Sequence, residues 1–109
     1  MAKAKTGKTV LIIEDDQSLL KILSHTLTSE NITVLEAQDG EVGLKVALEE
    51  HPDLILLDIV LPKMDGLTVL KKIRSDEWGK NVPVITLTNL GDIKTVSEVL
   101  EIGASEYLI

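Results

Sequence analysis

Short apolar runs alternate with longer amphipathic stretches along this chain. The runs at 10–13, 32–35, 54–57 and 84–87 consist mostly of Leu, Ile and Val, which is typical of strands buried on both faces of a parallel sheet. The stretches between them carry apolar residues at three- and four-residue spacing, as amphipathic helices do. The pattern predicts strands at 9–13, 32–36, 54–57, 83–88 and 105–109, and helices at 17–28, 40–50, 66–75 and 92–101.

Strands that alternate with helices indicate right-handed strand–helix–strand units. The fold class that follows is α/β, a doubly wound parallel sheet with helices on both faces. Residues 9–109 form one domain, and residues 1–8 form a basic tail that we expect to be mobile. We expect the last helix of such a fold to be absent, because the sequence ends within its last predicted strand.

Composition and charge narrow the classes of function. The 109 residues include 11 Lys and Arg, 18 Asp and Glu and no Cys, which gives a formal net charge of -7. An acidic chain without a basic stripe is not expected to bind nucleic acid directly, and the lack of Cys excludes thiolate metal sites and Cys nucleophiles. No stretch has the length of a membrane span or the pattern of a signal peptide, so we expect a cytoplasmic protein without a membrane partner.

Acidic residues follow two of the predicted strands. Glu14, Asp15 and Asp16 come directly after the first strand, and Asp58 comes directly after the third. In an open parallel sheet the functional crevice lies at the carboxyl ends of the strands. If these two strands are neighbours, Glu14, Asp15 and Asp58 converge there, and clustered carboxylates without His or Cys favour Mg²⁺ or Mn²⁺. The alternative is that Asp15 and Asp16 cap the next helix and Asp58 begins a loop; we expect Asp16 alone to be the cap.

The loop at 58–66 and the end of the fourth strand complete the chemistry at this crevice. The loop sequence Asp-Ile-Val-Leu-Pro-Lys-Met-Asp-Gly would hold the Asp58 carboxylate in place, and Thr88 supplies a hydroxyl. Backbone N–H groups after Asp58 and Thr88 are placed to hydrogen-bond a tetrahedral anion. These parts suit phosphoryl transfer with Asp58 as the nucleophile.

Five short motifs occur together in this chain. They are the pair Glu14 and Asp15, Leu-Leu-Asp-Ile-Val-Leu-Pro at 56–62, Met-Asp-Gly at 64–66, Thr88, and Gly-Ala-Ser-Glu-Tyr at 103–107. Together they resemble the response-regulator receiver domain of two-component signalling, over residues 8–109. The resemblance implies a flavodoxin-like fold with strand order 2-1-3-4-5. It also implies that Asp58 accepts a phosphoryl group from a histidine kinase or a phosphotransfer protein.

The resemblance further implies a set of metal ligands. Mg²⁺, or Mn²⁺ in its place, would be held by Asp15, Asp58 and the carbonyl of Val60, with Glu14 acting mainly through water. The family also has a Lys at the end of the last strand, whose ammonium pairs with the phosphoryl group. In this numbering that Lys would fall one or two residues past Ile109.

Thr88 and Tyr107 match the family's switch pair. The resemblance implies that phosphorylation repacks the face formed by the helix at 92–101 and the last strand for a downstream effector. From the residues alone, Tyr107 is an ordinary strand residue. The family usually has a small residue after the Thr, where this chain has Asn89, whose side chain either crowds the phosphoryl pocket or donates a hydrogen bond to it.

Two other functions share parts of this site. A haloacid-dehalogenase-type phosphatase also uses an Asp nucleophile and Mg²⁺, but its pattern is Asp-x-Asp, and Val60 stands where the second Asp would be. A binding module that has lost phosphotransfer would keep only the fold. We favour a regulatory phosphoacceptor, which performs its own phosphotransfer and a slow dephosphorylation but turns over no substrate as an enzyme does.

The end of the sequence leads to one more expectation. Without a helix after the last strand, the sheet face near Val10, Ile12 and the strand at 105–109 would lack cover. Exposed apolar faces and open sheet edges favour pairing with another chain. We therefore expect this 109-residue form to self-associate through the region of its last strand.

Overall fold

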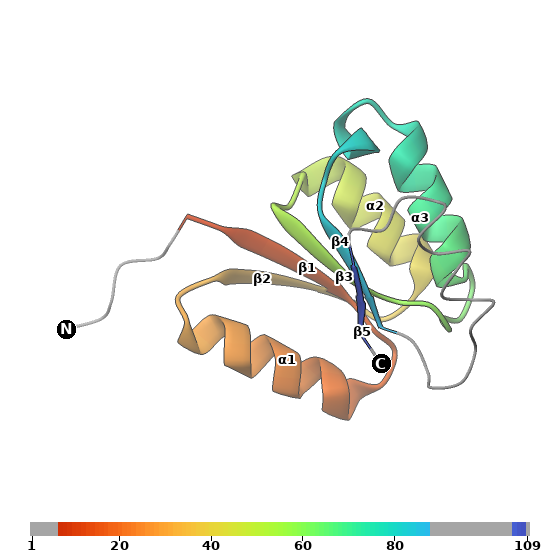
Figure 1. Cartoon of the computed structure of the whole chain (residues 1–109). Coiled ribbons are helices and arrows are strands. Elements are labelled where there is room, and N and C mark those ends of the chain that lie inside the picture. The colour runs from red at the N-terminus through yellow and green to blue at the C-terminus, as the bar shows by residue number, and fades with distance from the viewer. Residues whose placement is uncertain (1–6, 88–105, 109) are drawn as a thin grey trace.

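The computed structural model describes residues 7–87 and 106–108 of the chain. Its strands run parallel in one sheet with the order β2-β1-β3-β4-β5, so the predicted doubly wound, flavodoxin-like fold is confirmed (Figure 1). The strands are β1 (Thr9–Ile13), β2 (Thr33–Ala37), β3 (Leu54–Asp58), β4 (Val84–Leu87) and β5 (Glu106–Leu108), and the helices are α1 (Gln17–Ser29), α2 (Gly40–Glu50), α3 (Gly66–Ser75) and the short 3-10 helix η1 (Trp78–Lys80).

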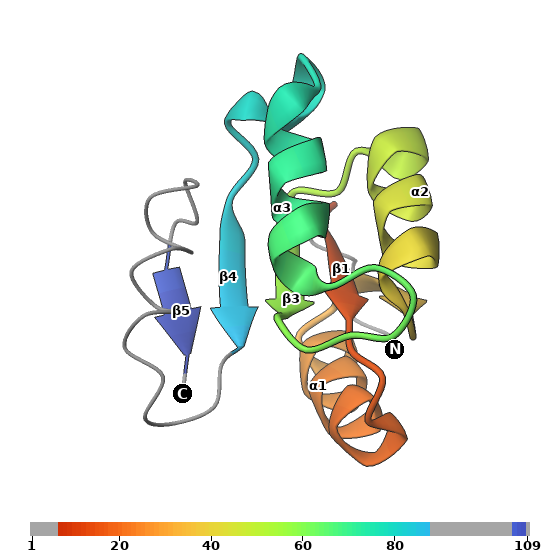
Figure 2. The same ribbon diagram turned by 90° about the vertical axis from the view of Figure 1, so that its right-hand side faces the viewer.

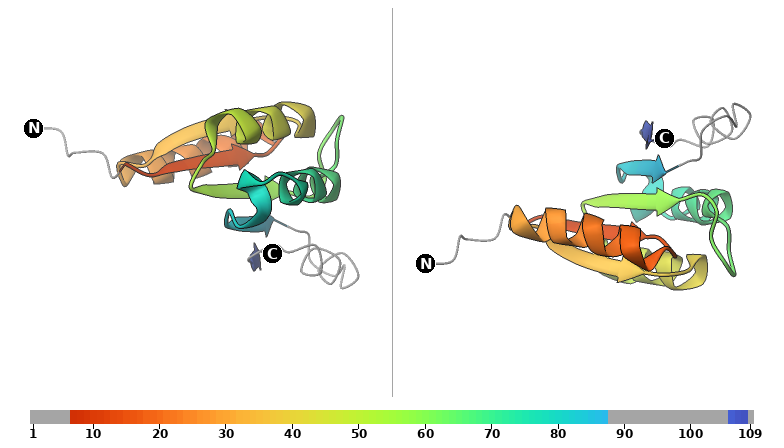
Figure 3. Two further views of the ribbon diagram at one scale, coloured as in Figure 1. Left: turned by 90° about the horizontal axis from the view of Figure 1, so that it is seen from above. Right: turned by 90° about the horizontal axis from the view of Figure 1, so that it is seen from below.

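The helices cover both faces of the sheet, with α1 on one face and α2 and α3 on the other (Figures 2 and 3). Alternation along β1 accounts for the two cores: Leu11 and Ile13 pack in the cluster under α2 and α3, whereas Val10 and Ile12 pack with residues of α1. The prediction that Val10 and Ile12 lack cover is wrong. They are only 4% and 0% exposed, because Leu20 of α1 belongs to the same buried cluster.

Several predicted features of the C-terminal part fall outside the described residues. These are Thr88, Asn89 and the helix at 92–101. Tyr107 lies in β5, where its backbone is the register partner of Thr86. In the part of the chain that the structure describes, no helix is both long and apolar enough to cross a membrane.

The order of the strands brings the ends of β1 and β3 together. From β1 the chain passes outward to β2, and it then returns past β1 to form β3 on the other side. The switch point of the sheet therefore lies between β1 and β3, where doubly wound proteins bind their ligands. Ile13 is the register partner of Leu57, so Glu14 and Asp58, the next residues along each strand, leave the sheet side by side.

Each of the three α-helices in the described part of the chain begins at this same carboxyl-terminal edge of the sheet with an Asp cap. The carboxylate of Asp16 accepts hydrogen bonds from the amides of Ser18 and Leu19, so the predicted role of Asp16 is confirmed. Asp39 and Asp65 cap α2 and α3 in the same manner. Helix amino termini favour negative charge, and this edge therefore suits an anionic ligand.

Candidate functional site

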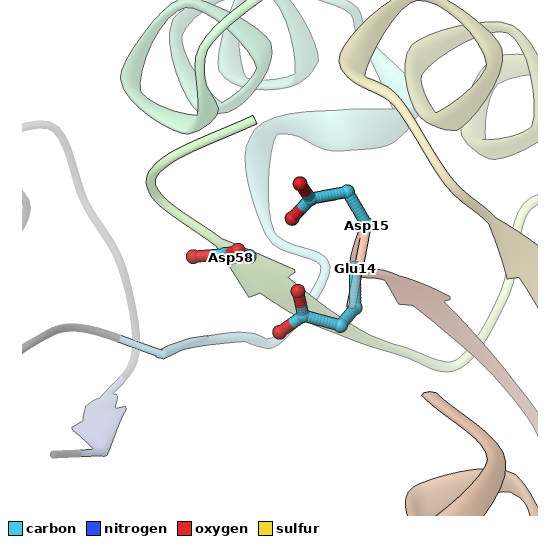
Figure 4. Close-up of side chains that lie close together, drawn as sticks. All are labelled: Glu14, Asp15 and Asp58. Atoms are coloured by element: carbon cyan, nitrogen blue, oxygen red, sulfur yellow. The ribbon is translucent and has the colours of Figure 1, made fainter. Parts of the chain in front are cut away.

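Glu14, Asp15 and Asp58 form one cluster at the carboxyl ends of β1 and β3 (Figure 4). One carboxylate oxygen from each residue lies within 4.8 Å of those of the other two. Glu14 is 3% exposed, whereas Asp58 is half-buried and Asp15 is exposed. The convergence predicted from the sequence is thus what the structure contains.

Backbone contacts hold Glu14 in place. Its N–H donates to the carbonyl of Ala37 at the end of β2 (2.9 Å), and its carboxylate accepts from the N–H of Asp16 (3.0 Å). The first bond fixes the end of β1 against the end of β2. The second ties the Glu14 carboxylate to the start of α1, while the neighbouring Asp15 is exposed.

Asp58 is held by the loop that follows it. Its carboxylate accepts a hydrogen bond from the N–H of Val60 (3.1 Å). The loop folds back so that the N–H of Gly66 donates to the carbonyl of Ile59 (2.8 Å). A Cβ at Gly66 would lie 2.3 Å from the carbonyl oxygen of Asp58, so only glycine allows α3 to begin this close to the phosphoacceptor candidate.

The electrostatics of the cluster reflect carboxyl groups that are partly buried and lie close together. The pKa of Glu14 is raised to about 7: burial is the largest cause, the nearby Asp58 and Asp15 add to it, and the hydrogen bond from the Asp16 amide opposes them. Burial also raises the pKa of Asp58, while hydrogen bonds from Glu14 and the Val60 amide oppose this rise. Both shifts mean that the ionised forms lack a compensating positive charge.

A hard divalent cation fits this donor set. The ligands on offer are carboxylate oxygens from three residues close enough to share one ion, and they include no nitrogen or sulfur. Such an ion would neutralise the charges whose mutual proximity raises the pKa values of Glu14 and Asp58. The residues therefore fit Mg²⁺ or Mn²⁺.

The raised pKa of Glu14 predicts a pH dependence of stability in the metal-free protein. Between its ordinary value of 4.5 and about 7, folded Glu14 keeps a proton that the unfolded chain has lost. The free energy of unfolding should therefore fall as pH rises through this window, by at most about 3 kcal/mol. Urea unfolding in the presence of a chelator at pH 5 and pH 8 measures the change.

Saturating Mg²⁺ should reverse much of this loss, because the ion binds only deprotonated carboxylates and so stabilises the chain more at pH 8 than at pH 5. Glu14→Gln removes one of the titrating groups, so the pH dependence in chelator should become smaller, while Asp58, whose pKa is also raised, keeps its share of it. Asp65 does not contribute to the change between pH 5 and pH 8, because its pKa is lowered and its effect on stability lies at more acidic pH. A metal-free wild-type protein that gains stability from pH 5 to pH 8 would contradict the prediction.

The structure places the other predicted site residues as follows. The N–H of Val60 faces Asp58, while its side chain is 69% exposed beside the cluster. Thr88 lies outside the described residues, and Tyr107 is described through its backbone only. The sequence analysis did not identify Asp39 and Gly40, which contact the loop after Asp58. The one feature of the sequence that points to them is that an Asp-Gly pair follows a predicted strand at the same edge of the sheet.

Comparison with known families gives a match over nearly the whole chain. Residues 10–109 match the sequence model of a family described as "Response regulator receiver domain". Among curated proteins, the chain is 40% identical over 99 residues to the DNA-binding dual master transcriptional regulator RpaA of Synechocystis, covering 91% of this chain and 41% of the relative. The chain spans about two fifths of the length of the curated relatives it matches first.

Solved structures agree with this match. A putative response regulator from Chloroflexus aurantiacus superposes with a TM-score of 0.87 at 34% identity, over 93% of this chain and 83% of that one. The receiver domain of the sensor histidine kinase PA1611 from Pseudomonas aeruginosa superposes with a TM-score of 0.86 at 30% identity, over 94% and 84%. The latter structure has a magnesium ion coordinated in its active site cleft.

Proposed function

Because the chain belongs to the family of response regulator receiver domains, we propose that Asp58 accepts a phosphoryl group in a two-component system. The observation that carries this proposal is the cluster of Glu14, Asp15 and Asp58 at the switch point of the sheet. Asp58 sits at the end of a buried strand, in contact with a neighbouring carboxyl and one backbone amide. A carboxyl group that is partly buried beside other carboxyl groups is functional when a cation and an anion bind next to it.

In the proposed reaction, a carboxylate oxygen of Asp58 attacks the phosphorus of a phosphohistidine on a histidine kinase or phosphotransfer protein. The new O–P bond forms as the N–P bond breaks, and the leaving imidazole takes up a proton. The Val60 amide holds Asp58 in position through its bond to the carboxylate. The amino termini of three Asp-capped helices at this edge favour the arriving anion.

We assign the metal ligands to Asp15, Asp58 and the carbonyl of Val60, with Glu14 acting through water. When bound, Mg²⁺ or Mn²⁺ supplies the charge neutralisation that lets a phosphoryl group approach these carboxylates. The hydrogen bond from the Val60 N–H to Asp58, which keeps Val60 beside the cluster, and the oxygen-only donor set support this assignment. The magnesium ion of the similar PA1611 receiver domain supports it as well.

The output of the domain is also part of the proposal. Thr88 and Tyr107 act as the switch pair, and their change repacks the face made by the helix at 92–101 and β5 for a downstream effector. Residues 9–109 perform this regulatory role without turning over a substrate and without a membrane partner, in the cytoplasm. The relative RpaA is a DNA-binding regulator, but this chain covers only 41% of it, so absence of direct nucleic-acid binding here stays a prediction.

Labelling with a small acyl phosphate donor tests the function. The chain is incubated with the donor in Mg²⁺ or in a chelator, and its intact mass is recorded. We expect one phosphoryl group in Mg²⁺ and none after chelation. No label in Mg²⁺ would favour a binding module that has lost phosphotransfer. Equal labelling in chelator would show that phosphorylation does not need the metal.

The lifetime of the phosphorylated state gives a further prediction. Val60 is the second residue after Asp58 and is exposed, so it flanks the path of a water that attacks the phosphoryl group, but it cannot orient that water by hydrogen bonding. We expect slow self-dephosphorylation of the wild type. Val60→Asn should accelerate it by roughly tenfold at most, which is well below the full effect of a general base. Val60→Leu, the apolar control, should leave the decay unchanged. Equal decay of the Asn and Leu variants after removal of the donor would contradict this.

A further inference from the structure

The segment between β2 and α2, residues 37–40, touches both loops that carry the carboxylates. At one end, the carbonyl of Ala37 accepts from the N–H of Glu14 (2.9 Å). At the other end, the N–H of Gly40 donates to the carbonyl of Pro62 in the loop after β3 (3.3 Å), and this loop reaches across to the start of α2 (Figure 2). We call residues 37–40 the strut, because they connect the end of β1 with the loop after Asp58.

The contact at Gly40 is too close for any other residue. A Cβ at this position would lie 1.8 Å from the carbonyl oxygen of Met64 and 2.7 Å from its carbonyl carbon. The loop is tightly turned at this point, with Lys63 at a φ of 67° and the N–H of Met64 bonded to the carbonyl of Pro62 (2.7 Å). The turn therefore presents its backbone directly to the first residue of α2.

A side-chain contact supports the same junction. One carboxylate oxygen of Asp39 accepts from the N–H of Val42 (2.9 Å) and caps α2. The other lies 4.0 Å from the Nζ of Lys63 in the loop after β3. The Asp39 side chain is only 16% exposed, so the carboxylate of this pair is largely shielded from solvent. Helix α2 thus begins against the loop through both backbone and side chain.

We propose that Gly40 and Asp39 are positioning residues for the metal site, which act by holding the loop at 59–65 against the strut. Neither residue touches the reacting groups. Glu14 is fixed to the strut at Ala37, and the loop that carries Val60 is fixed to it at Gly40. The strut, together with the pairing of β1 and β3, therefore sets the separation of the two loops between which Mg²⁺ would bind. This inference rests on the proposed function.

Gly40→Ala tests the strut by pushing the loop away. Calorimetric titration of the purified chain with Mg²⁺ should give a dissociation constant about tenfold higher than that of the wild type, as for loss of other groups that orient metal ligands. Gly79→Ala is the matched control: its Cβ would lie 1.9 Å from the carbonyl oxygen of Ile73, an equal clash in η1 before β4, at the opposite edge of the sheet. It should destabilise the chain but leave Mg²⁺ affinity unchanged. Equal shifts in both variants, or none in Gly40→Ala, would overturn the proposal.

Hydrogen exchange of the wild-type protein gives an answer even if Gly40→Ala fails to fold. Saturation with Mg²⁺ should slow exchange of the Gly40 amide, which donates across to Pro62. The amide of Asp53, which donates to the carbonyl of Thr9 (2.8 Å) at the opposite edge of the sheet, should change much less. An equal slowing of both amides would mean general stabilisation and would overturn the strut. A wild-type chain that binds no Mg²⁺ overturns the proposed function as well, whereas normal Mg²⁺ binding without a local effect at Gly40 overturns this inference alone.

Discussion

Asp58→Asn should abolish labelling of the chain by a small phosphodonor. The amide that replaces the carboxylate keeps the shape of the side chain and an oxygen that can accept from the Val60 N–H, but it is not a nucleophile toward phosphorus. Because burial and the neighbouring Asp15 raise the pKa of Asp58, the metal-free variant should also be more stable than the wild type at pH 8. Intact mass and urea unfolding measure the two effects.

Asp16→Asn is the matched control for this experiment. Asp16 lies beside the cluster but serves as the cap of α1, and Asn caps helices about as well as Asp does. The variant should therefore fold normally and accept as much label as the wild type. Loss of label in both Asp16→Asn and Asp58→Asn would show that the experiment detects general damage to this edge of the sheet. Equal label in the wild type and Asp58→Asn would show that Asp58 is not the acceptor.

Asp15→Asn should have the second largest effect, through the metal. Asp15 is exposed and its carboxylate lies within 4.8 Å of those of Glu14 and Asp58, so it supplies charge to the ion without being needed for the core. Loss of groups that only orient metal ligands costs about 10–100-fold in affinity. Loss of a ligand itself should raise the Mg²⁺ concentration for half-maximal labelling by at least about tenfold, with label recovered at high Mg²⁺.

The same substitution should stabilise the metal-free protein. The charge of Asp15 contributes to the raised pKa of Asp58, so replacing it by a neutral amide relieves repulsion in the folded state. A higher Mg²⁺ concentration for half-maximal labelling together with higher metal-free stability is a combination that a simple folding defect cannot produce. A variant that is less stable in chelator and labels with the Mg²⁺ dependence of the wild type would contradict the role given to Asp15.

The fold could be predicted from the sequence because each strand is a separate apolar run. The bounds expected for β1, α2 and α3 agree with those observed, since polar residues or helix caps end these segments locally. The strand expected at 32–36 lies instead at Thr33–Ala37, because its ends are set by pairing with β1. Helix η1 was not predicted. It has no periodic pattern, and it is held by Arg74, whose guanidinium donates to the carbonyls of Gly79 and Val82 (2.8 Å each).

The candidate site could be predicted only in outline. Its three carboxylates follow strands, so their convergence needed only that β1 and β3 be neighbours. Their unequal burial was not predictable, because it depends on the turn that directs Glu14 inward and leaves Asp15 exposed. The requirement for glycine at position 40 was also missed, since it comes from the carbonyl of Met64 in a distant loop and leaves no local pattern.

Locating the phosphoryl group on the chain decides whether Asp58 is the phosphoacceptor. An acyl phosphate on Asp is reduced by borohydride to homoserine, which peptide mass spectrometry assigns to a single residue. The chain is labelled with the small donor in Mg²⁺, reduced and digested. We expect homoserine at position 58 in the Mg²⁺ sample and at no position in the chelator sample. Homoserine at position 15, or a label that resists borohydride on a hydroxyl or imidazole side chain, would contradict this expectation.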